Sequence, residues 1–206
     1  LPEAYEYFES KKALWQKAED DWNKEFDEWA KENPDLKKLW DAFYNDEQTG
    51  SPEEIVFSDT DKMATRDASG KVLNMMCQKY ANIVGGSADL AGPNKTVLKD
   101  CGGIYSAQNR TGRTIEYGIR EFAMSAVCSG IKLHGGLRPF CATFLVFADY
   151  LRAQMRVASL MKLPIIYVLS HDSIYVGEDG PTHQPVETLS SLRAIPNVQV
   201  LRPADA

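Results

Sequence analysis

The sequence PIIYVLSHDSIYVGEDGPTHQP, residues 164–185, runs from an apolar segment into a loop crowded with polar side chains. The first seven residues are typical of a buried strand, while GEDGPTHQP holds two acids, a histidine, two glycines and two prolines. Glycine and proline shape a loop that would present Glu178, Asp179 and His183 to a crevice. Runs of this composition are also common in plain turns, so the spacing alone leaves both interpretations open.

Outward from this stretch, helical and strand-like periodicities alternate from Thr60 onward. Helical spacing covers about 60–80, 119–134 and 147–162, and a further helix is expected to begin near Gln184. Short apolar runs predict strands at 83–84, 114–117, 139–143, 165–169 and 198–201. This alternation predicts the α/β class, with a mainly parallel sheet flanked by helices. In such a sheet, ligands bind at the carboxyl ends of the strands.

Residues 1–54 differ from the rest of the chain in both charge and pattern. They hold 16 acidic and 7 basic side chains, whereas residues 55–206 carry a net charge of +3. Bulky apolar side chains recur there at helical spacing up to the breaker Asn33-Pro34. They are Tyr7, Phe8, Leu14, Trp15, Ala18, Trp22, Phe26, Trp29 and Ala30. We predict an acidic helical linker over 1–54 that packs on its own protein, with a partner-binding helix as the alternative.

Composition excludes several classes of protein. With 206 residues, 44% of them hydrophobic, the chain can bury a sizeable core. No apolar run approaches the roughly 20 residues that cross a bilayer, so no membrane partner is expected. A net charge of -6 without a basic stripe argues against nucleic acid. The four cysteines lack metal-like spacing, which favours buried thiols and a cytoplasmic protein. The start, LPEAYEYFES, has no initiator methionine, so we expect an internal fragment.

Three other polar clusters lie at matching points of the predicted sheet. GGSADL (85–90) follows a strand, YGIREF (117–122) joins a strand to a helix, and LSHDS (169–173) ends a strand. Four clusters at strand ends favour one shared binding crevice. Phe144, Phe147 and Tyr150 lie at a strand-to-helix junction, where they would be core residues or a stacking platform for a flat ring.

Taken together, these motifs resemble one known family. They look like the pyrimidine-binding domain of the transketolases, in order and without a visible gap from about Thr60 to Ala206: GGSADLA, YGIREFAMSA, LHGGLRPF, TFLVFADYLR, SHDSIYVGEDGPTHQPVE, LRAIPN and LRPAD. We place this domain at 55–206 and expect it to be truncated at its C-terminus. The acidic helix resembles the segment that joins this domain to a preceding pyrophosphate-binding domain. Deoxyxylulose-phosphate synthase and the pyruvate dehydrogenase beta subunit share the fold, but neither is similar to SHDSIYVGEDGPTHQP in full.

The resemblance implies thiamine diphosphate as cofactor, with a two-carbon ketol unit moved from a ketose phosphate to an aldose phosphate in the pentose phosphate pathway. Glu121 matches the catalytic acid that hydrogen-bonds ring nitrogen N1′ of the aminopyrimidine. Phe144, Phe147 and Tyr150 match its aromatic pocket, and Asp89 matches an acid near the cofactor and the subunit boundary. From the residues alone, Glu121 could equally be an acid at a helix N-terminus, and Asp89 could cap a turn.

The substrate contacts implied by the resemblance fall on the remaining clusters. Arg66 and His171 match residues that hold the sugar phosphate, since cationic donors suit a dianion. Asp179 matches the carboxylate that accepts a hydrogen bond from a sugar hydroxyl. His183 matches an imidazole beside the transferred ketol unit, and it joins Glu121 and His171 as a candidate catalytic residue.

Two departures from the family pattern limit what the chain is expected to do alone. Pro93 stands where the transketolases usually have a phosphate-binding serine, and either Asn94 or Thr96 could replace that donor. Nothing resembles the motif that holds the metal, so Mg²⁺ or Ca²⁺ would be bound by the preceding domain. We expect an inactive fragment of a homodimeric enzyme whose site lies at the subunit interface. The alternatives are a dihydroxyacetone synthase or a catalytically silent transketolase-like subunit.

Overall fold

The computed structural model describes all residues from 1 to 206 and divides into two compact units, 1–42 and 43–206. In the first unit, α1 (Pro2–Glu32) is a single long helix with no buried residue. It ends where Asn33 caps it, with Nδ2 donating to the carbonyl of Trp29 at 2.9 Å. The predicted break at Asn33-Pro34 is confirmed, and a second helix, α2 (Pro34–Tyr44), begins at once.

Aromatic side chains hold the turn between α1 and α2. The ring of Trp22 stacks on that of Phe26 with centroids 5.1 Å apart. Trp40 of α2 contacts the same Phe26 ring at 5.3 Å and the ring of Trp29 at 6.4 Å. Offset and edge-on aromatic pairs of this kind each contribute on the order of 1 kcal/mol beyond burial. The seam predicted from helical spacing is thus used in part to fold the helical segment back on itself.

The second unit is built on three parallel strands in the order β1-β2-β3. They are β1 (Ile83–Ser87), β2 (Arg138–Phe144) and β3 (Ile166–Ser170). The flanking helices are α3 (Thr65–Lys79), α4 (Ala91–Asn94), α5 (Glu121–His134), α6 (Ala148–Leu160) and α7 (Thr188–Arg193), with a short 3₁₀ turn, η1 (Leu145–Phe147), before α6. The predicted α/β class with a parallel, helix-flanked sheet is confirmed.

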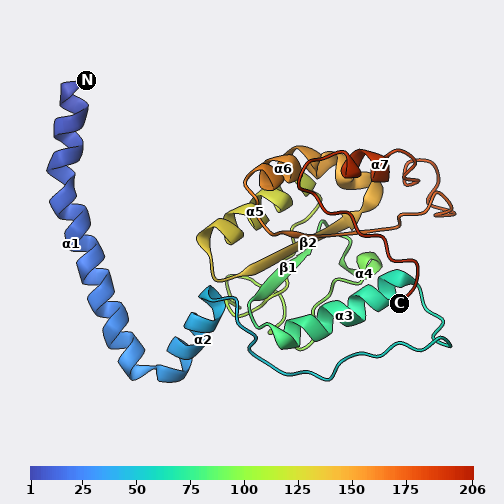
Figure 1. Cartoon of the computed structure of the whole chain (residues 1–206), viewed down its shortest axis with the longest axis horizontal. Helices are drawn as coiled ribbons and strands as arrows, with labels where there is room; N and C mark the ends of the chain where they lie inside the picture. The colour runs from blue at the N-terminus through green and yellow to red at the C-terminus, as the bar shows by residue number, and fades with distance from the viewer. The chain divides into compact units, whose positions relative to one another are not determined.

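The two faces of the sheet bury separate cores. Figure 1 shows α5, α6 and α7 on one face and α3 with α4 on the other. Met124, Leu151 and Leu192 are buried on the first face, and Cys77 with Phe140 on the second. Burial of such side chains stabilises the fold by about 1.5–3 kcal/mol each. Packing on both faces explains why β2, the central strand, is apolar along most of its length.

Two predicted strands and one helix start are wrong. Residues 114–117 make only isolated bridges at Thr114, because one pair of hydrogen bonds joins Gly85 to Arg113 and Ile115 before the chain turns toward α5. Residues 198–201 have no strand partner, although Val198 and Val200 pack on the core. The outer edge of β3 is therefore unpaired. The helix expected near Gln184 begins at Thr188, after a turn that contains His183.

No helix of the chain is both long and apolar enough to span a bilayer.

Candidate functional site

The candidate site gathers around the carboxyl ends of β2 and β3. Phe144 is the last residue of β2, and His171 directly follows β3. Their rings are 3.9 Å apart between centroids. His171 has a φ of 60°, a conformation that few residues with a side chain adopt and that clusters at functional sites. The fold thus places two sequence-predicted residues, from neighbouring strands, in direct contact.

Arg66, from the first turn of α3, joins this pair. Its Nη1 lies 2.8 Å from Nε2 of His171. A guanidinium can only donate, so Nε2 must accept and the imidazole must be neutral, with its proton on Nδ1. Burial lowers the pKa of His171 from its ordinary value, and the positive charge of Arg66 lowers it further. Cation and neutral imidazole face outward together, an arrangement that suits an anionic ligand.

His183 and Phe147 extend the cluster on its other side. The ring of His183 lies edge-on to Phe147 at 5.2 Å and to Phe144 at 5.9 Å. Its Nδ1 is 2.8 Å from the hydroxyl of Thr182. Asp179 is exposed on the same loop, close enough for its charge to act on the pKa of His171 and oppose the lowering. The polar loop after β3 therefore places two predicted site residues, Asp179 and His183, near the ends of the strands.

Glu121 is the first residue of α5 and is only 8% exposed. None of the hydrogen bonds or ion pairs of the chain involves its carboxylate, although buried acids almost always have a partner. The N-terminus of α5 itself provides a favourable field for this carboxylate but no replacement for a hydrogen bond. Glu121 is thus a largely buried acid without a hydrogen-bond partner in this chain.

The other predicted aromatic and acidic residues range from buried to exposed. Phe144 is buried, and its ring stacks with Phe147 at 5.9 Å. Tyr150 is 66% exposed, with its ring 6.0 Å from that of Phe147. Asp89 is exposed beyond β1 with a φ of 59°. The three rings form a row from core to surface. The core interpretation fits Phe144, and an exposed stacking platform fits Tyr150.

Comparison with known proteins decides what this arrangement belongs to. The family model for the transketolase pyrimidine binding domain matches residues 61–206. The chain belongs to the transketolase family. It is 49% identical over 210 residues to the transketolase of Treponema pallidum, covering 100% of this chain and 32% of that protein. To the transketolase of Geobacillus stearothermophilus it is 56% identical over 144 residues, covering 70% of this chain and 21% of that protein.

Solved transketolases have the same architecture. The complex of Pichia stipitis transketolase with sedoheptulose 7-phosphate superposes with a TM-score of 0.84 at 37% identity, covering 94% of this chain and 30% of that one. The chain thus spans no more than about a third of the length of the relatives it matches.

At Pro93, where the sequence predicts a missing phosphate donor, both side chains considered as replacements are buried. The amide of Asn94 is committed to Thr143 and Ser170. The hydroxyl of Thr96 belongs to a residue with 0% exposure and has no hydrogen-bond partner. Neither side chain is directed to a ligand, so the two replacements considered from the sequence are not available in this conformation.

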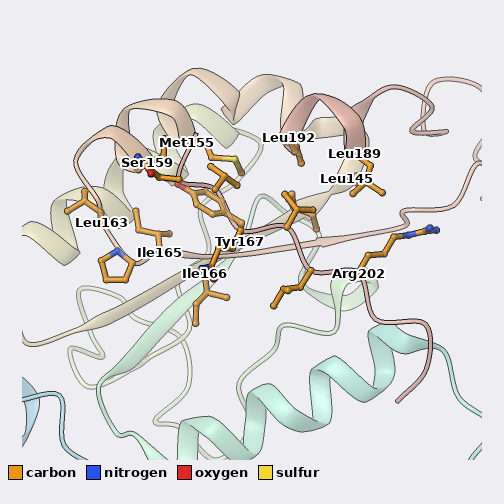
Figure 2. A pocket seen from close by; sticks show the side chains of 18 of the residues that line it. Leu145, Met155, Ser159, Leu163, Ile165, Ile166, Tyr167, Leu189, Leu192 and Arg202 are labelled. Atoms are coloured by element: carbon orange, nitrogen blue, oxygen red, sulfur yellow. The ribbon is translucent and has the colours of Figure 1, made fainter. Parts of the chain in front are cut away.

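A cavity of about 600 Å³ lies apart from these residues, beside β3. Figure 2 shows apolar side chains of α6, β3 and α7 around it, among them Met155, Tyr167 and Leu192. Arg202 stands at its rim and is ion-paired with Asp172. None of the predicted site residues lines this cavity, whose other polar lining side chains include Lys162, Ser159 and Tyr167. It is the space beside the unpaired edge of β3, and the chemistry of the transketolase pattern lies at the strand ends.

No group of three or more histidine, cysteine, aspartate or glutamate side chains is arranged to hold a metal ion. The sequence reasoning named Asn94 only as a possible substitute phosphate donor and Ser170 only as part of LSHDS, and it did not predict a contact between them. Both are ordinary polar residues in sequence, and only the fold shows that they touch.

Proposed function

We propose that the full-length protein containing this chain is a thiamine diphosphate-dependent transketolase (EC 2.2.1.1). It transfers a two-carbon ketol unit from a ketose phosphate to an aldose phosphate, as in the pentose phosphate pathway. Within it, this chain forms an acidic helical linker over 1–54 and a pyrimidine-binding domain over 55–206. The observation that carries the proposal is Glu121, a buried acid without a partner in a chain of the transketolase family.

The residues present fit the pyrimidine end of the cofactor. Glu121 would hydrogen-bond the ring nitrogen N1′, which supplies the partner that the carboxyl group lacks within the chain. Phe144, Phe147 and Tyr150 offer a graded row of rings against which a flat heterocycle would stack. Thiamine diphosphate, when bound, supplies the carbon nucleophile for cleaving and re-forming the ketose carbon–carbon bond. Asp89 would contact the cofactor from the end of β1.

The substrate would meet the histidine side of the cluster. Arg66 and His171 would bind the phosphate, with the guanidinium as one donor and Nε2–H of the protonated His171 ring as the other. Asp179 would accept a hydrogen bond from a sugar hydroxyl. His183 would orient or move a proton near the ketol unit, which an imidazole can do near neutral pH. The sugar phosphate bound in the Pichia stipitis relative supports this class of substrate.

The remaining parts of the active site are proposed to come from outside this chain. Mg²⁺ or Ca²⁺ would be held by the preceding domain of the full-length protein. A homodimer is supported by exposed apolar side chains on either side of Glu121, since Ile119 is 79% and Phe122 53% exposed. Such side chains beside a buried, unpartnered acid are suited to burial against a second subunit. We place the enzyme in the cytoplasm, on the grounds of its four buried free thiols.

The test is an assay of the full-length protein with thiamine diphosphate, xylulose 5-phosphate and one of two acceptors. Turnover with ribose 5-phosphate well above that with formaldehyde supports a transketolase. The reverse preference would make the protein a dihydroxyacetone synthase. No turnover with either acceptor, from protein that binds the cofactor, would make it a silent subunit and overturn the proposal.

A further inference from the structure

One buried side chain ties together the ends of all three strands. Asn94, the last residue of α4, is 1% exposed. Its Oδ1 accepts a hydrogen bond from the hydroxyl of Ser87 at 2.7 Å. Its Nδ2 donates to the carbonyl of Thr143 at 3.0 Å and to the hydroxyl of Ser170 at 2.7 Å. Ser87, Thr143 and Ser170 belong to β1, β2 and β3 respectively.

The contact with Ser170 continues into the candidate site. Oγ of Ser170 lies 2.8 Å from Nδ1 of His171, whose Nε2 meets Arg66. Since Arg66 requires Nε2 to accept, Nδ1 carries the proton and donates it to Ser170. A hydroxyl oxygen has two lone pairs, so Ser170 accepts from Asn94 and from His171 at once. Asn94 thereby fixes the oxygen against which the imidazole is oriented.

A purely structural role would require less than this. The bonds to Ser87 and Thr143 already fasten α4 to the sheet, and they do not lead to the site. The bond to Ser170 reaches the one hydroxyl that receives the Nδ1 proton of His171. The residues that follow Asn94 and Ser170 both have a left-handed backbone conformation, with φ of 58° at Lys95 and 60° at His171. Such conformations persist where surrounding contacts over-determine them.

We propose that Asn94 is a positioning residue that acts through Ser170 to hold the His171 ring with its Nε2 lone pair toward Arg66. Asn94 touches neither Arg66 nor the imidazole, and its effect passes through the serine hydroxyl. The consequence for substrate binding depends on the proposed function, in which Arg66 and His171 hold a phosphate. The consequence for the imidazole itself does not.

The first measurement is therefore made on the imidazole. Nitrogen-15 spectra of the 206-residue chain resolve the tautomers of its three histidines, and His134, at the end of α5, serves as the internal reference. Ser170→Ala and Asn94→Ala should each shift the His171 tautomer ratio away from the Nδ1–H form by about 2- to 10-fold, as expected for one hydrogen bond. Ser170→Thr, which keeps the hydroxyl, should retain the wild-type ratio.

A matched control and a double variant separate positioning from general destabilisation. Ser125→Ala removes another buried hydroxyl, one that bonds Tyr167 of β3, and should leave His171 unchanged. In the Ser170→Ala background, Asn94→Ala should have little further effect on His171, because the path from Asn94 is already cut. An equal effect of Asn94→Ala in both backgrounds, or none in either, overturns the proposal. If Asn94→Ala does not fold, an unchanged His171 in Ser170→Ala overturns it.

The second measurement uses the full-length protein. Ser170→Ala should raise KM for a phosphorylated ketose about 2- to 10-fold, relative to KM for an unphosphorylated one, with a smaller change in kcat. Equal changes for the two ketoses would overturn the effect on substrate. Absence of all ketol transfer by the wild type would refute the proposed function, while the tautomer spectra would still decide the role of Asn94.

Discussion

The guanidinium of Arg66 and the imidazole of His171 are hydrogen-bonded at 2.8 Å across 105 positions of sequence. The bond exists only while His171 is neutral, because a protonated ring would face the guanidinium with a donor on each side. Binding an anion at this point would remove that conflict, since an anion accepts from both groups. Protonation state and ligand occupancy are therefore coupled in this pair.

We expect the free energy of unfolding of the chain to fall as the pH is lowered through the pKa of folded His171. That pKa lies below the ordinary value, first because of burial and next because of Arg66, while Asp179 and Asp172 oppose the shift and His183 adds to it. The unfolded chain thus binds the proton at higher pH, near the ordinary histidine pKa of about 6.5. The contribution is present above that value and is lost below it.

Urea unfolding of wild type and His171→Asn between about pH 7.5 and about pH 5 measures this contribution. The variant should show a shallower loss of stability on acidification. His134→Asn, which changes a histidine at the end of α5, is the control and should keep the wild-type slope. Parallel curves for wild type and His171→Asn would exclude a native-state effect of this histidine.

Glu121→Gln should lower kcat of the full-length enzyme by at least about 100-fold, the lower range for a positioned acid or base. An amide keeps the size of the side chain, but it has no acidic proton to exchange with a ring nitrogen. Turnover at saturating thiamine diphosphate is the measurement, with circular dichroism to verify folding. Activity within a few-fold of wild type would remove Glu121 from the proposed role.

Pro93→Ser should lower KM for phosphorylated sugars in the full-length enzyme with little change in kcat, the sign of uniform binding. Proline has neither a hydroxyl nor a backbone N–H. The amide of Asn94 is bonded elsewhere, and the hydroxyl of Thr96 is buried without a hydrogen-bond partner. A hydrogen bond to a charged group contributes about 1.5–3 kcal/mol, or about 10- to 150-fold in binding. The ratio of KM for xylulose 5-phosphate to that for an unphosphorylated ketose decides the matter, and an unchanged ratio counts against a missing donor.

The chain of 206 residues should bind thiamine diphosphate no more tightly than about 1 mM, because only the pyrimidine end meets residues of this chain. Isothermal titration calorimetry with and without Mg²⁺ measures this directly. Micromolar affinity would show that the diphosphate is also held here, and would contradict the assignment of those contacts to another domain.

Gly86→Ala should destabilise the domain by about 1–3 kcal/mol, the usual result of overpacking. A Cβ at this position of β1 would lie 1.9 Å from the carbonyl oxygen of Ile115. The matched control is Gly130→Ala in α5, where an added Cβ meets nothing within 4 Å. That variant should gain about 0.8–1.0 kcal/mol from helix propensity. Chemical denaturation compares the two, and equal midpoints would contradict the packing of residue 115 on β1.

Most of the sheet and its helices could be predicted because the period of the apolar residues changes clearly between elements. The runs at 139–143 and 165–169 correspond to β2 and β3, whose bounds differ from the predicted ones by one residue at each end. The runs at 114–117 and 198–201 have the same appearance, but pairing depends on a partner strand, which a local pattern cannot show. The late start of α7 has a similar cause, since the turn containing His183 continues the polar loop.

At the candidate site, the sequence motifs predicted which residues take part, but not which of those residues contact one another. The aromatic, acidic and histidine residues were found through motifs, and the structure brings Arg66, His171, His183, Phe144 and Phe147 together. Asn94 was considered from the sequence only as a substitute phosphate donor, and Ser170 only as a member of LSHDS. Their importance comes from a contact across 76 positions, which arises only when α4 folds over the ends of the strands.

The unpaired edge of β3 has a consequence for handling this chain. A strand edge offers a row of free backbone donors and acceptors to any neighbouring molecule, and natural proteins guard such edges with charge, proline or a covering element. Ile166 of β3 is 56% exposed, and the strand IYVLS carries no charged residue. Segments of this kind pair with their own copies and seed aggregation. Purifying the chain alone therefore means contending with edge-to-edge association, at a strand whose sequence has no charge to oppose it.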